Sequence, residues 1–168
     1  MSLRCSETRD KKILTSPCDG TIFSISEIKD INDLTIVKDH KYNIEEFLFG
    51  ANKLPEDVER IQKEIKDNKL VYQITIYLSP GDCHRFFSPG DICANKRIYN
   101  PGYLEPVKPS YIKKNPHVFK TNERVTLQCK WEKNQEDFLY ITFVGAMNVG
   151  SIKLNFDSSL TTNQKIVF

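Results

Sequence analysis

Apolar and polar residues alternate along several short stretches of this 168-residue chain, and this alternation limits the folds open to it. Apolar side chains occupy every second position of residues 124–131: Val125, Leu127, Cys129 and Trp131. Successive side chains of a β-strand point to opposite faces of a sheet, so the spacing predicts a strand with one buried face. Further strands are predicted at residues 21–28, 34–37, 70–78 and 151–156. The chain is therefore expected to be mainly β.

Two stretches have the features of helices. Residues 54–69 place Pro55 in the first turn and space their apolar side chains three and four apart, which predicts one amphipathic helix packed on the sheet. A shorter helix is predicted at residues 43–49, ended by Gly50. Residues 138–144 are apolar on both faces and are expected in the centre of the sheet. We predict one compact α+β domain over residues 1–168, with an antiparallel or mixed sheet.

Residues 100–121 differ from the rest of the chain because they contain four prolines among lysines and aromatic residues. Proline removes a backbone donor, so this density predicts an irregular and mobile surface loop. The lysines of residues 108–120 could contact anionic lipid headgroups, at about 1 kcal/mol each near such a surface. The alternative is that they are solvated lysines with no partner.

Charge and cysteine content exclude several classes of protein. The formal net charge is +2, which gives no overall field that would attract nucleic acid. The five cysteines form no metal-binding pattern and are odd in number, so we expect reduced thiols and no metal site. Neither a secretory signal nor eighteen consecutive apolar residues occur, so no transmembrane span is expected.

Four blocks stand out for their order and spacing: SPCDG at residues 16–20, LSPGDCHRFFSP at 78–89, NERV at 122–125 and VGAMNVGSI at 144–152. They resemble the blocks of phosphatidylserine decarboxylases. Residues 148–157 and 160–163 are similar to the mitochondrial members. The resemblance runs from about Ser16 to about Thr162 and implies the β-subunit portion of such an enzyme. In this family the precursor cuts itself at the serine of a Leu-Gly-Ser-Thr motif, and that serine becomes the pyruvoyl group of a small α subunit.

The resemblance implies roles for three residues, each of which also has a simpler explanation. Asp19 matches the aspartate of the Asp-His-Ser triad of self-cleavage, although Asp-Gly after proline is also a common turn. His84 is implied to lie beside the pyruvoyl group and to assist decarboxylation, or else it is a structural histidine. Arg85 could pair with the substrate phosphate or carboxylate, or could brace the loop through Asp82 or Asp91.

Two further residues are assigned to substrate binding by the resemblance, Phe86 and Asn148. The glycines around Asn148 could let backbone amides approach an anion, but the stretch lacks the Lys-Thr end of a phosphate-binding loop, and strand bulges explain it equally. The NERV block is expected to be structural. We predict that a charged pair at the start of its strand holds the loop from Asn100 against the body of the protein.

The chain departs from the family pattern in two respects. Phe87 occupies the position of the second histidine, the base that takes the serine proton during maturation, and phenylalanine cannot accept a proton. Cys83 replaces the usual tyrosine. Only His40 and His117 remain as other histidines. The second departure is that residues 1–168 contain no Leu-Gly-Ser-Thr run and hence no serine that could become the pyruvoyl group.

These departures favour a degenerate, non-catalytic relative of the decarboxylases. It is expected to act as a structural or phospholipid-binding subunit of an assembly at the mitochondrial inner membrane, with peripheral membrane contact. The alternative is the β subunit of an active enzyme, which makes phosphatidylethanolamine with a pyruvoyl group on a separate α chain. No cofactor is expected in this chain, because decarboxylation needs an electron sink that its side chains do not supply. The third hypothesis is a ligand-binding β domain unrelated to lipids.

Overall fold

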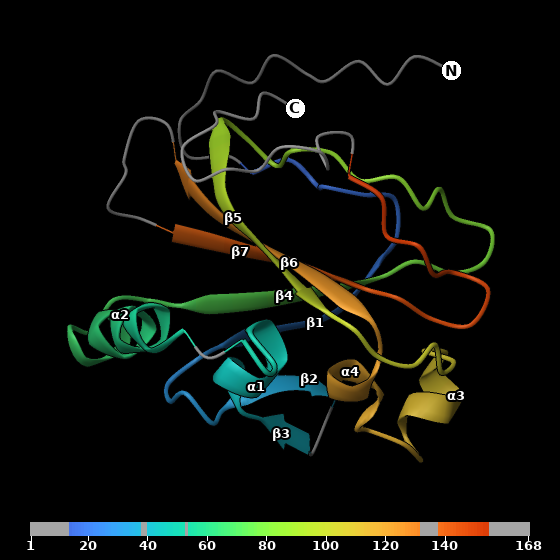
Figure 1. Cartoon of the computed structure of the whole chain (residues 1–168), viewed down its shortest axis with the longest axis horizontal. Coiled ribbons are helices and arrows are strands. Elements are labelled where there is room, and N and C mark those ends of the chain that lie inside the picture. Colours follow the sequence, from blue (N-terminus) through green and yellow to red (C-terminus); the bar gives the residue numbers. More distant parts are fainter. Residues whose placement is uncertain (1–13, 38–39, 53, 132–137, 155–168) are drawn as a thin grey trace.

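The computed structural model describes residues 14–37, 40–52, 54–131 and 138–154, and its strands form three antiparallel sheets (Figure 1). The largest sheet contains β5 (Ile92–Asn100), β6 (Arg124–Trp131) and β7 (Phe138–Val144), with β6 between the other two. Two-stranded sheets pair β1 (Thr21–Glu27) with β4 (Tyr72–Tyr77) and β2 (Leu34–Val37) with β3 (His40–Tyr42). The predicted mainly β, α+β fold is confirmed.

The long predicted helix is α2 (Pro55–Lys66), and it packs on the three-stranded sheet through a buried carboxylate. Asp57 binds one residue on each strand of that sheet: it pairs with Lys96 at 2.9 Å, accepts from Gln128 at 2.5 Å and accepts from Tyr140 at 3.4 Å. Burial raises the pKa of Tyr140 well above its usual range, and the charge of Asp57 raises it further. The polar contacts satisfy a carboxylate that would otherwise be costly to bury.

The short predicted helix is α1 (Ile44–Leu48), and both of its ends have the expected residues. The side chain of Asn43 accepts a hydrogen bond from the backbone of Glu46, which is the usual N-terminal cap. Gly50 follows with a φ of 57°, a conformation that favours glycine. The predicted helix and its terminating glycine are confirmed.

Two further short helices correct the prediction of an irregular, mobile loop over residues 100–121. They are α3 (Pro109–Ile112) and α4 (Val118–Thr121), and Ile112 and Val118 are almost fully buried. The prolines mislead because proline is well tolerated in the first turn of a helix, where Pro109 stands. No helix in the described ranges is long and apolar enough to cross a membrane.

The three-stranded sheet corrects two predictions about strands. Residues 138–144 form β7, which lies at the end of the described strand order and not in its centre. All seven of its side chains are half-buried. Apolar residues on both faces of β7 are therefore each partly covered, and they do not indicate a central strand. Residues 151–154 form no strand, and the predicted continuation to residue 156 lies outside the described residues.

β5 was not predicted because a bulge interrupts its alternation. The pairing with β6 shifts register between Ala94 and Lys96. Such a bulge moves the following side chains to the other face, so the period of two is lost in the sequence. Buried residues from β5 nevertheless contribute to both hydrophobic clusters of the protein, Ile98 to one and Ile92 to the other.

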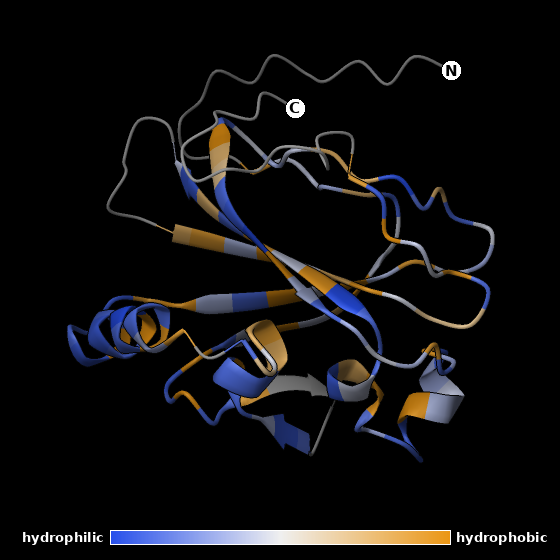
Figure 2. Ribbon diagram, viewed as in Figure 1, coloured by the Kyte–Doolittle hydropathy of each residue, from blue (hydrophilic) through white to orange (hydrophobic). Residues whose placement is uncertain are grey.

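The sheet of β1 and β4 carries an unusual exposed surface, which we call the β1–β4 apolar face. It consists of Ile22, Ile25, Tyr72 and Ile74, which are 54–59% exposed. Ile25 pairs with Ile74 across the two strands, and Tyr72 lies two residues from Ile74, so these side chains share one face. Figure 2 colours parts of both strands as hydrophobic. Contiguous exposed apolar surface of this kind marks interaction sites.

Candidate functional site

The first two sequence blocks lie side by side in the structure. The backbone N–H of Phe87 donates to the carbonyl of Pro17 at 2.7 Å, and that of Thr15 donates to the carbonyl of Pro89 at 3.0 Å. Cys18 and Phe86 form an antiparallel bridge next to the contact between Pro17 and Phe87. Segments about 70 residues apart in the chain are therefore held together by backbone hydrogen bonds, next to the start of β1 (Figure 1).

Two carboxylates, Asp19 and Asp82, influence the Cys18 thiol at the junction of the two blocks. Burial raises the pKa of the Cys18 thiol, and the negative charges of Asp19 and Asp82 raise it further. Asp19 comes from the first block and Asp82 from the second, and Asp19 is exposed. The structure thus brings the predicted aspartate of the triad to the same junction as the histidine-containing block. A thiol in this setting is held in its neutral form and is a poor nucleophile.

A tight turn orients His84 within the second block. Both the backbone N–H and the hydroxyl of Ser79 donate to the Asp82 carboxylate at 2.7 Å. These hydrogen bonds lower the pKa of Asp82, and the nearby His84 also contributes to the shift. The Nδ1 atom of His84 lies 2.9 Å from the carbonyl oxygen of Asp82. Since a carbonyl only accepts, Nδ1 carries a proton, and in the neutral ring Nε2 has the lone pair.

His84 and Arg85 are both exposed, as a binding role requires. The Asp82 carboxylate accepts from Ser79, and among the described residues no ion pair between Asp82 and Arg85 is seen. The turn made by Ser79 and Asp82 therefore presents a ring nitrogen and a cation to solvent. A ring nitrogen with a lone pair can accept a proton, and a guanidinium can bind a phosphate or a carboxylate.

The two phenylalanines of this block differ in their surroundings. Phe86 stacks on Phe143 of β7 with ring centres 3.8 Å apart and an interplanar angle of 28°, and it packs against the smaller hydrophobic cluster. Phe87 is 46% exposed although its backbone is fixed to Pro17. Phe86 is thus an anchor of the block, whereas Phe87 presents an aromatic ring at the position where the resemblance predicts a base.

Asn148 lies in a two-residue turn of the fourth block. Ala146 and Val149 exchange backbone hydrogen bonds of 2.8 Å, and Asn148 between them has a φ of 64°. Asparagine tolerates this left-handed conformation better than most residues, so the turn explains its presence without a ligand. Within the described part of the chain, no hydrogen bond joins Asn148 to Asp19, His84 or Arg85.

The glycines that flank this turn allow close packing. A Cβ atom on Gly150 would lie 2.8 Å from a methyl group of Leu104, and one on Gly145 would lie 3.0 Å from the other methyl group. Leu104 therefore fills the space that side chains at these positions would need. Packing explains both glycines, and no anion site is required for them.

The NERV block has a structural role, but not through the predicted charged pair. The Arg124 guanidinium is buried and donates to the carbonyls of Phe47 at 2.7 Å, Glu46 at 2.8 Å and Lys120 at 2.8 Å. These carbonyls belong to α1 and α4, so Arg124 binds the two short helices to the start of β6. Its neighbour Glu123 accepts instead from the Tyr99 hydroxyl at 3.1 Å.

Asn122 is the second buried polar residue of the NERV block. Its side chain is fully buried, accepts from the Glu105 backbone at 3.1 Å, and donates to the carbonyls of Glu105 and Gly145 at 2.9 Å. It thereby joins the loop after Asn100 to the fourth block. The prediction that this block holds that loop is confirmed, with hydrogen bonds to backbone as the means.

The same blocks that pack together in the structure match one protein family. The family described as phosphatidylserine decarboxylase matches residues 4–167. The chain belongs to this family. It is 39% identical over 150 residues to the mitochondrial phosphatidylserine decarboxylase proenzyme of Caenorhabditis elegans, an alignment that covers 89% of the chain and 36% of the relative.

Two further relatives come from a bacterium and a mammal. The phosphatidylserine decarboxylase proenzyme of Campylobacter jejuni is 34% identical over 154 residues, covering 90% of the chain and 53% of the relative. The mitochondrial phosphatidylserine decarboxylase proenzyme of Rattus norvegicus is 36% identical over 158 residues, covering 88% and 38%. The chain therefore spans about a third to about half of the length of these phosphatidylserine decarboxylase relatives.

The other two histidines lie apart from the decarboxylase blocks. His40 and His117 line a separate pocket with Tyr42, and none of the residues that line it comes from residues 16–20 or 78–89. Neither histidine is therefore placed to replace the missing base at Phe87. Among the described residues, no group of three or more His, Cys, Asp and Glu side chains is arranged to hold a metal ion.

Sequence reasoning missed Asp82 as the residue that positions His84. Its signal was present, because a serine three residues before an aspartate at a proline-glycine turn often forms side-chain to backbone hydrogen bonds. The contacts of Arg124 could not have been found in this way. Three of its four carbonyl partners belong to α1 and α4, whose position beside β6 depends on the whole fold.

Proposed function

We propose that this chain is a phospholipid-binding subunit of the phosphatidylserine decarboxylase type that does not mature or decarboxylate by itself. It would hold an aminophospholipid headgroup at the junction of the first two blocks, as part of a larger assembly at the mitochondrial inner membrane.

The observation that carries this proposal is the position of Phe87. Its backbone is fixed to Pro17 within an intact frame, and its ring stands where the resemblance places the base of self-cleavage. A phenyl ring has no lone pair for the serine proton. The surrounding frame, including Asp19 and the turn of Asp82, is retained. Loss of the base within a retained frame supports a protein that keeps its binding surface and has lost maturation.

The exposed side chains of the second block support headgroup binding. Arg85 presents a guanidinium, which binds phosphate or carboxylate oxygens in a bidentate manner. His84 presents Nε2 next to it in the sequence, with its Nδ1 fixed by Asp82. A phosphoserine headgroup carries both anionic groups that such a pair would recognise. Phe86 contributes indirectly, because its stacking on Phe143 fixes the backbone beside Arg85.

The β1–β4 apolar face supports the need for a protein partner. Ile22, Ile25 and Ile74 are more than half exposed, which is costly in water at about 25 cal/mol per Å² of apolar surface. An α-subunit-like chain or another subunit that covered this face would remove that cost. We therefore propose this face as the contact with the partner.

The names of the relatives support the proposed location. The proteins of Caenorhabditis elegans and Rattus norvegicus are named mitochondrial. Exposed Lys108, Lys113 and Lys114 lie around α3 and could add peripheral contact with anionic headgroups.

A second candidate function is the β subunit of an active decarboxylase with a separate α chain, and the geometry of His84 favours it. When bound, a pyruvoyl group supplies the electron sink for decarboxylation. The exposed Nε2 atom fits a position beside such a group, and the fixed tautomer would let His84 hold or move a proton there. Arg85 would orient the substrate through its anionic groups.

The test is to incubate the purified chain with vesicles that contain phosphatidylserine labelled at the serine carboxyl. We expect binding to the vesicles, no labelled carbon dioxide, and no carbonyl on the protein that reacts with hydrazine. Arg85→Gln should weaken binding about fivefold, whereas the matched control Lys66→Gln on α2 should not. Release of carbon dioxide would reject the non-catalytic proposal in favour of the second candidate. Equal vesicle binding by Arg85→Gln and the wild type would reject the headgroup site.

A further inference from the structure

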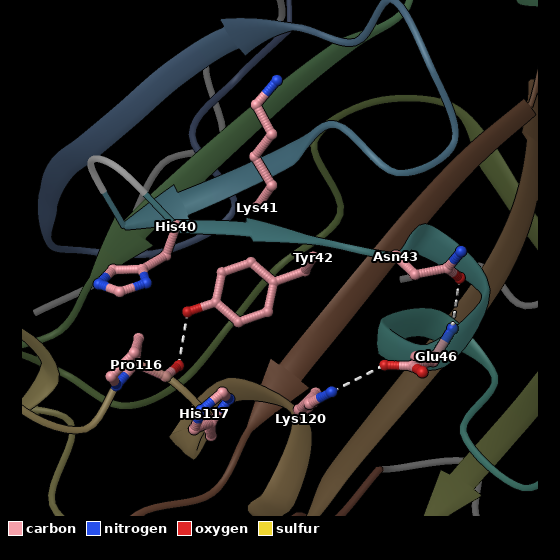
Figure 3. Close-up of a pocket in the computed structure, with 8 residues that line it drawn as sticks. All are labelled: His40, Lys41, Tyr42, Asn43, Glu46, Pro116, His117 and Lys120. Carbon is pink, nitrogen blue, oxygen red and sulfur yellow. Dashed lines mark hydrogen bonds and ion pairs between the residues drawn. The ribbon is translucent and has the colours of Figure 1, made fainter.

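A hollow lies away from the decarboxylase blocks, between β3, the start of α1 and the segment that leads into α4 (Figure 3). Its volume is about 120 Å³. A bound water needs about 10–15 Å³ of such space, so the hollow has room for a group of several heavy atoms. It is open to solvent, and in Figure 1 it lies at the β3 and α4 end of the molecule.

Two segments far apart in the sequence form its walls and are tied together at one point. The Tyr42 hydroxyl donates to the carbonyl of Pro116 at 2.5 Å. Burial raises the pKa of Tyr42 to about 12, so this hydroxyl keeps its proton and the contact persists across the physiological range. His40 precedes Tyr42 and His117 follows Pro116. The contact therefore fixes the spacing of the two imidazoles, which lie on either side of it in Figure 3.

The charged groups of the hollow are mostly basic. His40, His117 and Lys120 lie around it, and Glu46 of α1 is its acidic member. Lys41 also belongs to the lining, but its side chain points away in Figure 3 and pairs with Asp33 at 2.6 Å.

The basic side chains of the hollow remain able to bind a ligand. Among the described residues, the rings of His40 and His117 have no hydrogen-bond partner. Lys120 pairs with Glu46 at 2.9 Å, but their side chains are 38% and 60% exposed. Such exposed ion pairs are worth at most about 1 kcal/mol, so the ammonium can turn to another anion at little cost.

We propose that the hollow formed by His40, His117 and Lys120 is a phosphate-binding site, distinct from the headgroup site proposed above. Two imidazoles and an ammonium line the hollow, and each of them can donate to a phosphate oxygen. The phosphate can be free or can belong to a lipid headgroup, since both offer the same oxygens. A metal is disfavoured by the absence of a suitable ligand group among the described residues.

The pH dependence follows from the histidines. Histidine changes its charge between about pH 5 and 8, and the imidazolium form binds an anion. Affinity should therefore be highest at the acidic end of this range and fall as the pH rises.

The experiment is a titration of the full chain with inorganic phosphate, followed by the NMR signals of the histidine rings. At about pH 6 we expect saturable shifts of His40 and His117, and weaker binding at about pH 8. His40→Gln, His117→Gln and Lys120→Gln should each weaken binding about three- to fivefold. Lys66→Gln removes the same charge from α2, outside the hollow, and serves as the matched control. All four side chains are exposed, so the variants should fold, which circular dichroism checks.

A second arm separates the two sources of phosphate. The same proteins are mixed with phosphatidylcholine vesicles that contain or lack phosphatidic acid. Binding of inorganic phosphate with the expected variant pattern supports a site for a free phosphate. Binding only to vesicles with phosphatidic acid, with that pattern, supports a lipid headgroup. The proposal is overturned if neither probe binds, or if Lys66→Gln weakens binding as much as Lys120→Gln does.

Discussion

Two blocks that both match the decarboxylase family have opposite surroundings in this protein. The NERV block is buried, and each polar side chain that it buries binds backbone groups of other segments. The block that contains His84 and Arg85 is fixed by its own turn and by backbone contacts, while its polar side chains point to solvent. Family resemblance alone does not separate these cases. The contacts do, since buried donors with complete partners stabilise the fold, and exposed donors without partners remain available to a ligand.

The position at which the resemblance predicts a departure from the family belongs to the exposed block. Phe87 lies in the exposed block, where a substitution changes chemistry with little effect on packing. The resemblance finds no departure in the NERV block. A chain that keeps its framework residues and changes an exposed reactive position retains the fold regardless of its activity.

The largest predicted effect is the loss of Arg124. Arg124→Leu should reduce the free energy of unfolding by about 3–5 kcal/mol, because several buried carbonyls of α1 and α4 lose their donor. Urea unfolding measures this change. The matched variant Arg85→Leu should change stability by less than about 0.5 kcal/mol. Equal losses of unfolding free energy in Arg124→Leu and Arg85→Leu would contradict the distinction between the buried and the exposed block.

A smaller loss is expected for Asn122. Asn122→Ala removes three hydrogen bonds from a fully buried site and should cost about 2–3 kcal/mol of unfolding free energy. Asn148→Gly is the control, because glycine adopts the φ of 64° without strain and the side chain has no partner to lose. Equal losses of stability in Asn148→Gly and Asn122→Ala, measured by thermal unfolding, would contradict this prediction.

The third prediction concerns the turn that orients His84. The folded-state pKa of Asp82 is below its usual value because Ser79 donates to the carboxylate. A lowered folded pKa means that the turn is fully stabilised above the unfolded-state pKa of an aspartate, about 3.9, and loses this contribution as the pH falls through the lower folded value. NMR titration of the Asp82 carboxyl should show this, and Ser79→Ala should move its pKa upward. An unchanged pKa in Ser79→Ala would show that Ser79 does not stabilise the charged form.

The smallest effect on stability is expected at Phe87. Because the ring is 46% exposed, Phe87→His should change the free energy of unfolding by less than about 1 kcal/mol. Thermal unfolding with an unchanged circular dichroism spectrum would support this. A large loss would mean that the phenyl ring is a packing residue and that its presence has a structural cause.

Much of the fold could be predicted from the sequence where a single element has one buried face. β6 and α2 follow their apolar spacing, and Gly50 ends α1 as expected. Prediction from the sequence failed where contacts between distant segments determine the local structure. The bulge in β5 removes the period of two, and the residues around α3 become helical because Ile112 and Val118 pack into the core.

The candidate site could be predicted from the sequence only as a set of residues. The junction of Asp19 with the His84 block depends on backbone hydrogen bonds between distant segments, which no local pattern reveals. The role of Phe86 was also hidden, since its stacking partner Phe143 is more than 50 residues away in the sequence. The roles proposed for His84, Arg85 and Asn148 stay predictions.

The central claim is that Phe87 prevents maturation within an otherwise retained frame, and self-cleavage tests it most directly. The chain is joined to the C-terminal segment of the Caenorhabditis elegans relative, and the hybrid is made with Phe87 and with Phe87→His. Mass spectrometry then measures cleavage and the pyruvoyl group. We predict that the hybrid with Phe87 stays intact while Phe87→His is cleaved. Equal cleavage of the two hybrids would contradict the claim.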